Sequence, residues 1–319
     1  MNSVSKKNKY EIDMCNGSIM DKLISFSLPL MLSGILQLMF NAVDIVVVGR
    51  FSGSQALAAV GSTSALINMF TNLFIGVSLG ANVLAARFYA SGRSKEMSET
   101  VHTSITFALI SGIVMVFVGL FFSRFALELM ATPPDVINQA ALYMKIYFLG
   151  MPFFMLYNYG AAILRAVGDT KRPLFFLIAA GLINAGLNMV LVIVFHLGVA
   201  GVAIATVISQ LVSCVLVLRC LYQSDSSYQL RFSKLTLKKN HLKQIFQVGI
   251  PAGIQSTVIN FSNVLLQSSV NSFGSIAMAG YTAANNYFWF LVCCGEFRYS
   301  GMYELYQSEL WSWKMEAHG

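Results

Sequence analysis

One acidic residue, Asp44, lies inside a long run of uncharged residues. No other side chain between Ile24 and Val48 carries a charge. Gln37, Asn41 and Asp44 are spaced at i, i+4 and i+7, so an α-helix would place all three on one face. A carboxyl group beside amide side chains on such a face has the chemistry to bind and release a proton or a cation such as Na⁺.

Two interpretations of Asp44 follow from this pattern alone. In the structural one, the carboxyl group hydrogen-bonds to amide side chains and fixes helix packing, which contributes about 0.6–2 kcal/mol per contact in membranes. In the functional one, Asp44 exchanges a cation or a proton, because a medium of low dielectric constant disfavours the charged form of a carboxyl group. We favour the functional interpretation, since acidic residues in membrane-spanning segments usually mark ion or substrate pathways.

Further polar side chains recur in the other apolar segments. They are Asn68 and Asn72 in the second segment, Tyr143, Tyr147, Tyr157 and Asn158 in the fourth, and Asn184 and Asn188 in the fifth. The members of the first and last pairs are four residues apart, so each pair also lies on a single helix face. We expect these side chains to form a polar interior among the first six helices.

The composition places these segments in a membrane. Hydrophobic residues make up 56% of the chain and charged residues 11%, whereas roughly a quarter of the residues of soluble domains are charged. Continuous apolar runs of about 20 residues, the length that crosses a bilayer, predict an all-α polytopic membrane protein. The runs lie near 23–48, 57–86, 101–122, 140–164, 173–195, 199–221 and 245–272, with a partial eighth from 276.

The basic residues predict the orientation of the chain. With a cytoplasmic N-terminus, sixteen Lys and Arg residues fall on the cytoplasmic side and three, Arg50, Arg124 and Lys145, on the outside, as the positive-inside rule requires. We therefore expect a multi-pass protein of the plasma (inner) membrane and no nucleic-acid partner. The sequence contains no His/Cys cluster, Walker loop or nucleophile motif. It thus predicts no enzymatic activity, no cofactor and no metal other than Na⁺ at Asp44.

The start and the end of the apolar region are related in sequence. Residues 26–60 resemble residues 248–281. The matching residues are Pro29 with Pro251, Asn41 with Asn263 and, after a shift of one residue, Gly53 with Gly274. We infer two parallel repeats joined by a basic linker, an architecture found in transporters. Asp44 has Leu266 as its counterpart, so the acid belongs to the first repeat only.

Over about residues 18–286 the sequence resembles the multidrug and toxic compound extrusion (MATE) family, and most closely its DinF-like branch. The motifs that carry this resemblance are LPLMLSGILQLMFNAVDIVVVG, LRAVGDTKRP, LINAGLNMVLVIVFHLGVAGVAIAT and GIPAGIQSTVINFSNVLLQSSVNSFG. The resemblance implies a two-lobe transporter of twelve helices, which exports cationic or amphipathic compounds by proton or sodium antiport. This chain would contain the six-helix N-lobe and the start of the C-lobe, as a monomer in the lipid bilayer.

The resemblance also implies a cation or proton site in the N-lobe. The site maps onto Asp44, surrounded by Asn41, Tyr143, Asn158, Asn184 and Asn188, and the bend of the first helix maps onto Pro29. Some members of this branch carry a second acid at the position of Asn188, so we expect a site with one acid here. The sequence leaves open whether H⁺ or Na⁺ is the coupling ion.

The resemblance divides the chain into five parts. They are a cytoplasmic segment at 1–22, the N-lobe at 23–221, a basic cytoplasmic linker at 222–244, the start of the C-lobe with helix seven and part of helix eight at 245–286, and a tail unlike the family at 287–319. Back-translation of the tail, shifted by one base, allows a sequence similar to the family's eighth helix. We therefore expect a one-base insertion near codon 287 and a truncated, frameshifted product.

Two other functions fit the same segments. A lipid-linked oligosaccharide flippase of the same superfamily would also have repeated helices, but more basic residues would be expected in its cavity. A non-transporting membrane protein, or an inactive fragment of a transporter, would need Asp44 only for packing. Among these, we favour cation-coupled export of small amphipathic or cationic molecules.

Overall fold

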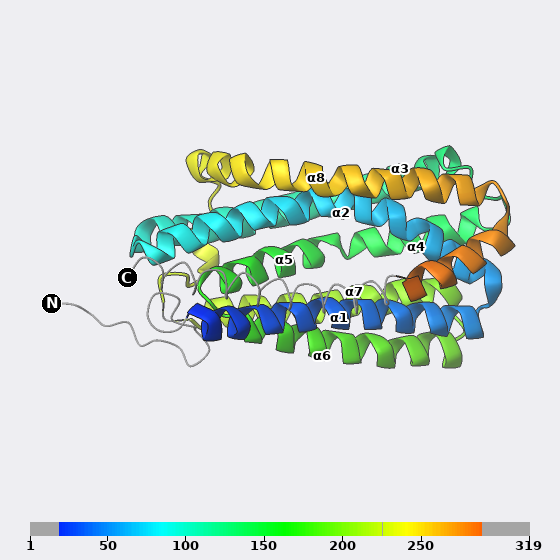
Figure 1. The fold of residues 1–319 in the computed structure, drawn as a ribbon, viewed down its shortest axis with the longest axis horizontal. Coiled ribbons are helices and arrows are strands. Elements are labelled where there is room, and N and C mark those ends of the chain that lie inside the picture. Colours follow the sequence, from blue (N-terminus) through cyan, green and yellow to red (C-terminus); the bar gives the residue numbers. More distant parts are fainter. Residues whose placement is uncertain (1–18, 225, 289–319) are drawn as a thin grey trace, which may run out of the picture.

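The computed structural model describes residues 19–224 and 226–288, which are almost entirely helical (Figure 1). The helices are α1 (Ile19–Phe51), α2 (Gly53–Ala90), α3 (Ser94–Leu129), α4 (Ile137–Leu149), α5 (Met151–Ala166), α6 (Lys171–Asn188), η1 (Met189–Val194), α7 (Gly198–Tyr222), η2 (Phe232–Lys234) and α8 (Lys239–Asn271). A further helix follows over 275–288. The predicted parts 1–22 and 287–319 lie outside the described residues, apart from 19–22 and 287–288.

The expected membrane-spanning helices of the N-lobe are present. Five segments are long and apolar enough to cross a bilayer, namely Ser25–Phe51, Gly53–Ala90, Ser94–Leu129, Lys171–Val194 and Gly198–Tyr222. The pair α4 and α5 makes a sixth when it is counted as one broken span. These six correspond to the six apolar runs predicted within 23–221, although most of the helices extend several residues beyond the predicted limits.

The run predicted at 140–164 is not one continuous helix. It breaks after Leu149, and α4 and α5 are bent by 49° relative to each other. Pro152 explains the break, because a proline has no N–H to donate and its ring clashes with the carbonyl group four residues earlier. The bend is packed tightly against α3, where a Cβ added to Gly112 would lie 2.5 Å from the Cα of Pro152.

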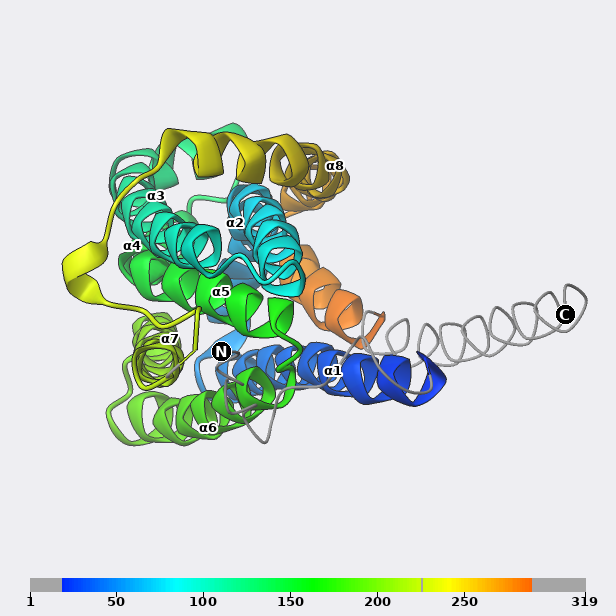
Figure 2. The same ribbon diagram turned by 90° about the vertical axis from the view of Figure 1, so that its left-hand side faces the viewer.

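The helix α5 lies at the centre of the bundle. It packs against α2, α3 and α7, and in the end-on view it separates the α3–α2 side from the side formed by α1, α6 and α7 (Figure 2). Polar groups fix it to α2, since the hydroxyl of the fully buried Tyr159 donates to the carbonyl of Phe74 at 3.2 Å. The amide of Asn82 also donates to the carbonyl of Ala162 at 2.7 Å. Such bonds are valuable in lipid, where a backbone or side-chain group without a partner is costly.

The structure supports the internal repeat. Both α1 and α8 are helices of 33 residues with a proline in their first half. Each is followed by a glycine with positive φ, 87° for Gly53 and 90° for Gly274, which is a backbone conformation that favours glycine. The two repeats therefore share the turn between their first and second helices as well as sequence.

The run predicted at 245–272 forms the helix α8, but α8 is not among the segments apolar enough to count as spans. Its sequence includes Gln255, Ser256, Thr257 and Asn260 within two turns. Several of these polar groups bond within the helix, as the hydroxyl of Thr257 does to the carbonyl of Gly253 at 2.8 Å. In a membrane, polar side chains of this kind need partners in protein or water, because lipid offers none.

One face of α8 lies directly against α2 along most of its length (Figure 1). Gly76 and Gly80 of α2 face Gly249 and Gly253 of α8, and both pairs have the spacing Gly-x-x-x-Gly that lets helix backbones touch. A Cβ added to Gly76 would lie 2.2 Å from the Cα of Gly253, and one added to Gly249 would lie 2.6 Å from the Cα of Val77. We call these four glycines the glycine seam.

The seam predicts that Gly76→Ala destabilises the protein. The new Cβ would overlap the backbone of α8, so the helices must separate, and overpacking of this kind typically costs about 1–3 kcal/mol. The thermal unfolding midpoint in detergent should therefore fall.

Gly34→Ala in α1 is the matched control, because no atom lies within 4 Å of its added Cβ. This variant should be neutral or stabilised by up to about 1 kcal/mol, since alanine favours helix. Equal unfolding midpoints for the two variants would contradict the inference that α2 and α8 need glycine at their contact.

Candidate functional site

Asp44 lies about two turns before the end of α1. Its carboxyl group faces α6. Its Oδ1 accepts a hydrogen bond from the side-chain amide of Asn188. The two helices approach closely one turn earlier, because Gly181 of α6 has no side chain and the ring of Phe40 fills that space. A Cβ at Gly181 would lie 1.9 Å from this ring. The glycine therefore lets α1 come near enough for Asp44 to reach its partner.

Asn188 continues the contact into a chain of polar groups. It also donates to Oδ1 of Asn184 at 3.1 Å, and Asn184 in turn donates to the hydroxyl of Thr206 at 3.4 Å. Asn184 and Asn188 are buried, with 4% and 0% of their surfaces exposed. The carboxyl group on α1 is thus linked through α6 to α7. We call Asp44, Asn188, Asn184 and Thr206 the acid–amide chain.

A change of helix type occurs at the same level. The α-helical part of α6 ends at Asn188, and the next six residues, Met189–Val194, form the π-helix η1. A π turn has a wider hydrogen-bond spacing, and such turns occur frequently at functional sites. Because η1 packs against α1 and α7, the irregular turn lies between the two helices that the acid–amide chain joins.

Aromatic side chains of α4 lie beside the acid. Tyr143 and Tyr147 are close enough to Asp44 to interact with its charge, and their rings lie 6.0 Å apart. Tyr143 is buried. Gln210 of α7 lies beside Tyr147, and the two side chains interact.

The arrangement fits a proton or a small hard cation. It gathers one carboxyl group with amide and hydroxyl oxygens, which is the kind of donor set that binds Na⁺ or H⁺ beside irregular helices in transporters. The Oδ1 atom of Asn188 is buried and has no hydrogen-bond partner among the residues that the structure describes. A buried acceptor without a donor is costly, and a cation or a protonated group next to it would remove that cost.

Another acid lies in the loop after α5, but its environment is different. Asp169 is fully buried, accepts the backbone N–H of Arg172 at 3.1 Å and forms an ion pair with the guanidinium of the same residue. Arg172 further contacts the sulfur of Cys220 at 3.0 Å. A carboxylate neutralised by a fixed arginine is suited to holding a loop, whereas Asp44 has no basic partner among the described residues.

The structure brings together only part of the predicted site. The acid–amide chain contains three of the predicted residues, Asp44, Asn184 and Asn188, and Tyr143 lies beside Asp44. The side chain of Asn41 is exposed. Asn158 donates to the carbonyl of Phe154 in its own helix at 2.8 Å.

Other polar residues singled out in the sequence also lie apart from the site. Gln37 is exposed, and Asn72 bonds to the carbonyl of Asn68 within α2 at 2.7 Å. Pro29 lies within α1, which continues as one helix through it, so its role as a bend stays a prediction.

Sequence reasoning missed Thr206 and Gln210. Both lie on α7, where Thr206, Gln210 and Ser213 are spaced at i, i+4 and i+7. This is the same spacing that drew attention to Gln37, Asn41 and Asp44. The signal was therefore present, but a hydroxyl and one amide in an apolar helix are common and do not by themselves indicate a site.

The chain is similar in sequence to known proteins. The profile of the family described as MatE matches residues 29–190. The probable multidrug resistance protein YoeA of Bacillus subtilis is 34% identical over 269 residues, which are 82% of this chain and 58% of YoeA. The multidrug export protein MepA of Staphylococcus aureus (strain MRSA252) is 26% identical over 265 residues, 81% of this chain and 57% of MepA. The chain thus spans well under two thirds of the length of these relatives.

Solved structures share the fold. A structure of the MATE multidrug transporter DinF-BH superposes with a TM-score of 0.82 at 22% identity, covering 90% of this chain and 65% of that one. A MATE family transporter of the MOP superfamily in the inward-facing conformation gives a TM-score of 0.73 at 22% identity, covering 82% and 60%.

The acid–amide chain predicts that Asn188→Ala destabilises the protein. The change removes the donor to Asp44 and the link to Asn184, and the loss of a hydrogen bond to a buried acid costs about 1–3 kcal/mol. The thermal unfolding midpoint in detergent should fall.

Asn72→Ala provides the control, because the amide of Asn72 bonds only to its own helix backbone. It should change the stability by less than about 0.5 kcal/mol. An Asn188→Ala variant as stable as Asn72→Ala would show that the acid–amide chain does not stabilise the fold.

Proposed function

The chain belongs to the MatE family, and from this premise we propose that it forms the N-terminal lobe, and the start of the second lobe, of a cation-coupled exporter of drugs or organic cations. The observation that carries the proposal is the acid–amide chain, in which one carboxyl group in a membrane-spanning helix is linked to two further helices. The names of the relatives, multidrug resistance and export proteins, support the substrate class.

In the proposed mechanism, Asp44 alternates between a free carboxylate and a neutralised state. As a carboxylate it accepts a hydrogen bond from the side-chain amide of Asn188, which holds α1 against α6 and η1. A proton or a Na⁺ ion on the carboxyl group removes its charge and competes with this bond, so occupancy changes the relative stability of two arrangements of α1. A ligand shifts such an equilibrium by the difference between its affinities for the two states.

Pro29 gives α1 a place to bend. Since proline has no N–H, the carbonyl of Ser25 lacks its normal partner within the helix. The hydroxyl of Ser33 bonds to the carbonyl of Pro29 itself at 2.8 Å. A helix with one backbone bond missing bends at less cost than a regular one. We propose that the occupancy of Asp44 is transmitted to this position along α1.

Substrates are proposed to compete with the cation near the same helices. Tyr143 and Tyr147 present aromatic surfaces beside a negative charge, a combination that attracts organic cations through charge and cation–π contacts. Proton and sodium coupling are both compatible with the donor set. We further propose that the transporter acts as a monomer in the plasma membrane with its N-terminus in the cytoplasm, as the distribution of basic residues predicts.

The proposal predicts that Asp44→Asn abolishes ion-driven export. The amide keeps the size of the side chain but can neither ionise nor carry a proton, so an imposed H⁺ or Na⁺ gradient can no longer drive ethidium out of the vesicle. The measurement is dye export in proteoliposomes. It uses this chain and a version extended in the alternative reading frame predicted from the tail, since the match covers only 58% of YoeA.

Glu128→Gln is the matched control, because it also removes one carboxylate, from an exposed ion pair with Arg124. Export by the extended protein should persist in this control and disappear in Asp44→Asn. Gradient-driven export that survives Asp44→Asn would refute the proposed role of Asp44.

A further inference from the structure

A cavity of about 440 Å³ opens where the linker between α7 and α8 crosses the start of α3. Figure 2 shows this linker running from α7 across one end of the bundle to α8. The residues that line the cavity are Lys95, Ser98, Glu99 and His102 of α3 and Lys234 and Thr236 of the linker. Two segments more than a hundred residues apart in sequence therefore form its walls.

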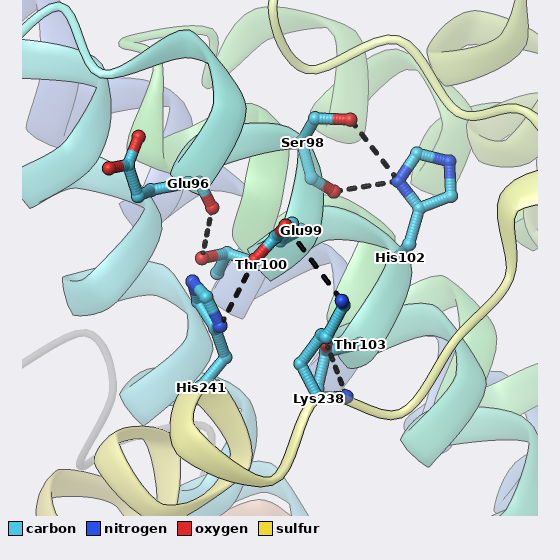
Figure 3. A network of polar contacts seen from close by, with 8 residues as sticks. All are labelled: Glu96, Ser98, Glu99, Thr100, His102, Thr103, Lys238 and His241. Carbon is cyan, nitrogen blue, oxygen red and sulfur yellow. Dashed lines mark hydrogen bonds and ion pairs between the residues drawn. The ribbon is translucent and has the colours of Figure 1, made fainter.

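The linker is held in place by bonds to α3. The backbone N–H of Arg231 donates to Nε2 of His102 at 3.1 Å, and Nδ1 of the same ring bonds to the carbonyl of Ser98 at 2.6 Å. The backbone N–H of Lys238 donates to the hydroxyl of Thr103 at 3.3 Å (Figure 3). Because both ends of the segment 231–238 are fixed, the shape of the cavity between them is defined.

The cavity carries an excess of positive charge. Its one acid, Glu99, lies 4.0 Å from Nζ of Lys238 and 3.8 Å from Nδ1 of His241, so its charge is directed to the start of α8 (Figure 3). Lys95 and Lys234 are exposed, and neither forms an ion pair within residues 19–224 and 226–288. Two free ammonium groups from different segments thus border one cavity.

The surroundings place the cavity at a membrane surface. α3 has 36 residues, about 54 Å at 1.5 Å per residue, so its ends must project beyond a hydrocarbon layer of roughly 30 Å. Next to the cavity, Phe232 is 55% exposed and stacks on the exposed Tyr222, with ring centroids 5.9 Å apart. Leu237 is also exposed. Exposed aromatic rings among basic residues are typical of the interfacial zone of a bilayer.

We propose that this cavity binds the phosphate headgroup of an anionic phospholipid, with Lys95 and Lys234 as its ligands. Basic pockets at the rim of helical membrane proteins bind such headgroups. The exposed apolar side chains beside the cavity favour a lipid over free phosphate, since acyl chains would cover them. A headgroup held by both lysines bridges α3 and the linker, and so fixes the start of α8. This site is independent of the transport mechanism proposed above.

The test uses the purified 319-residue chain in a neutral detergent. Phosphatidylglycerol, phosphatidylcholine and inorganic phosphate are added separately, and lipid binding is followed by native mass spectrometry and thermal unfolding. The double variant Lys95→Gln/Lys234→Gln is compared with Lys239→Gln/Lys243→Gln. The second pair removes the same charge from positions on α8 that do not line this cavity.

Phosphatidylglycerol should bind the unmodified chain and raise its unfolding midpoint, whereas phosphatidylcholine and inorganic phosphate should not. The cavity variant should lose on the order of tenfold or more in phosphatidylglycerol affinity, and the α8 variant less than about twofold. Equal losses in the two variants would show attraction to general surface charge and overturn the proposal. So would an equal effect of inorganic phosphate, or no preference between the two lipids.

Discussion

A carboxyl group inside a membrane-spanning helix needs a polar partner, because lipid offers neither water nor counter-ions to it. In this protein that partner is the amide of Asn188, and the contact fixes how α1 lies against α6. Asn188 also hydrogen-bonds to Asn184, and Asn184 hydrogen-bonds to Thr206, which connects the acid to α7. Hydrogen bonds that start at one acid therefore join three helices. In the proposed mechanism a single proton or cation changes the same contact, so that a structural constraint also serves as a switch.

The rest of the bundle is built so that this contact can form. Glycine lets α1 approach α6 at Phe40, and the glycine seam brings α8 against α2 without side chains between them. The break at Pro152 lets α4, which carries the two tyrosines, run at an angle to the central helix α5. At the end of the bundle where α3 begins, His102, Thr103 and Glu99 hold the linker and the start of α8. The first helix of the second repeat is thus attached to the first repeat at its middle and at one end.

Periodicity and hydropathy were sufficient to predict the helical class and the six N-lobe spans, whereas the grouping of Asp44 with Asn184 and Asn188 came from the resemblance to the MATE family. Periodicity and hydropathy could not predict contacts between helices that are far apart in the sequence. The Gly-x-x-x-Gly pairs in α2 and α8 are visible in the sequence, yet nothing local indicates that they meet. Hydropathy is continuous across 140–164, so it hid the break that Pro152 imposes. Asn41 and Asn158 were also assigned to the site. In the structure Asn41 is exposed and Asn158 bonds to a carbonyl of its own helix, so their part in the site stays a prediction.

In the proposed mechanism the Asp44 carboxyl group changes its protonation or cation occupancy while the fold persists. Infrared difference spectroscopy on the reconstituted chain measures this directly, by switching the buffer between acidic and neutral conditions or between choline and Na⁺. We expect a carboxyl band that responds to one of these exchanges and is missing from the spectrum of Asp44→Asn. A difference spectrum unchanged by that substitution would contradict it.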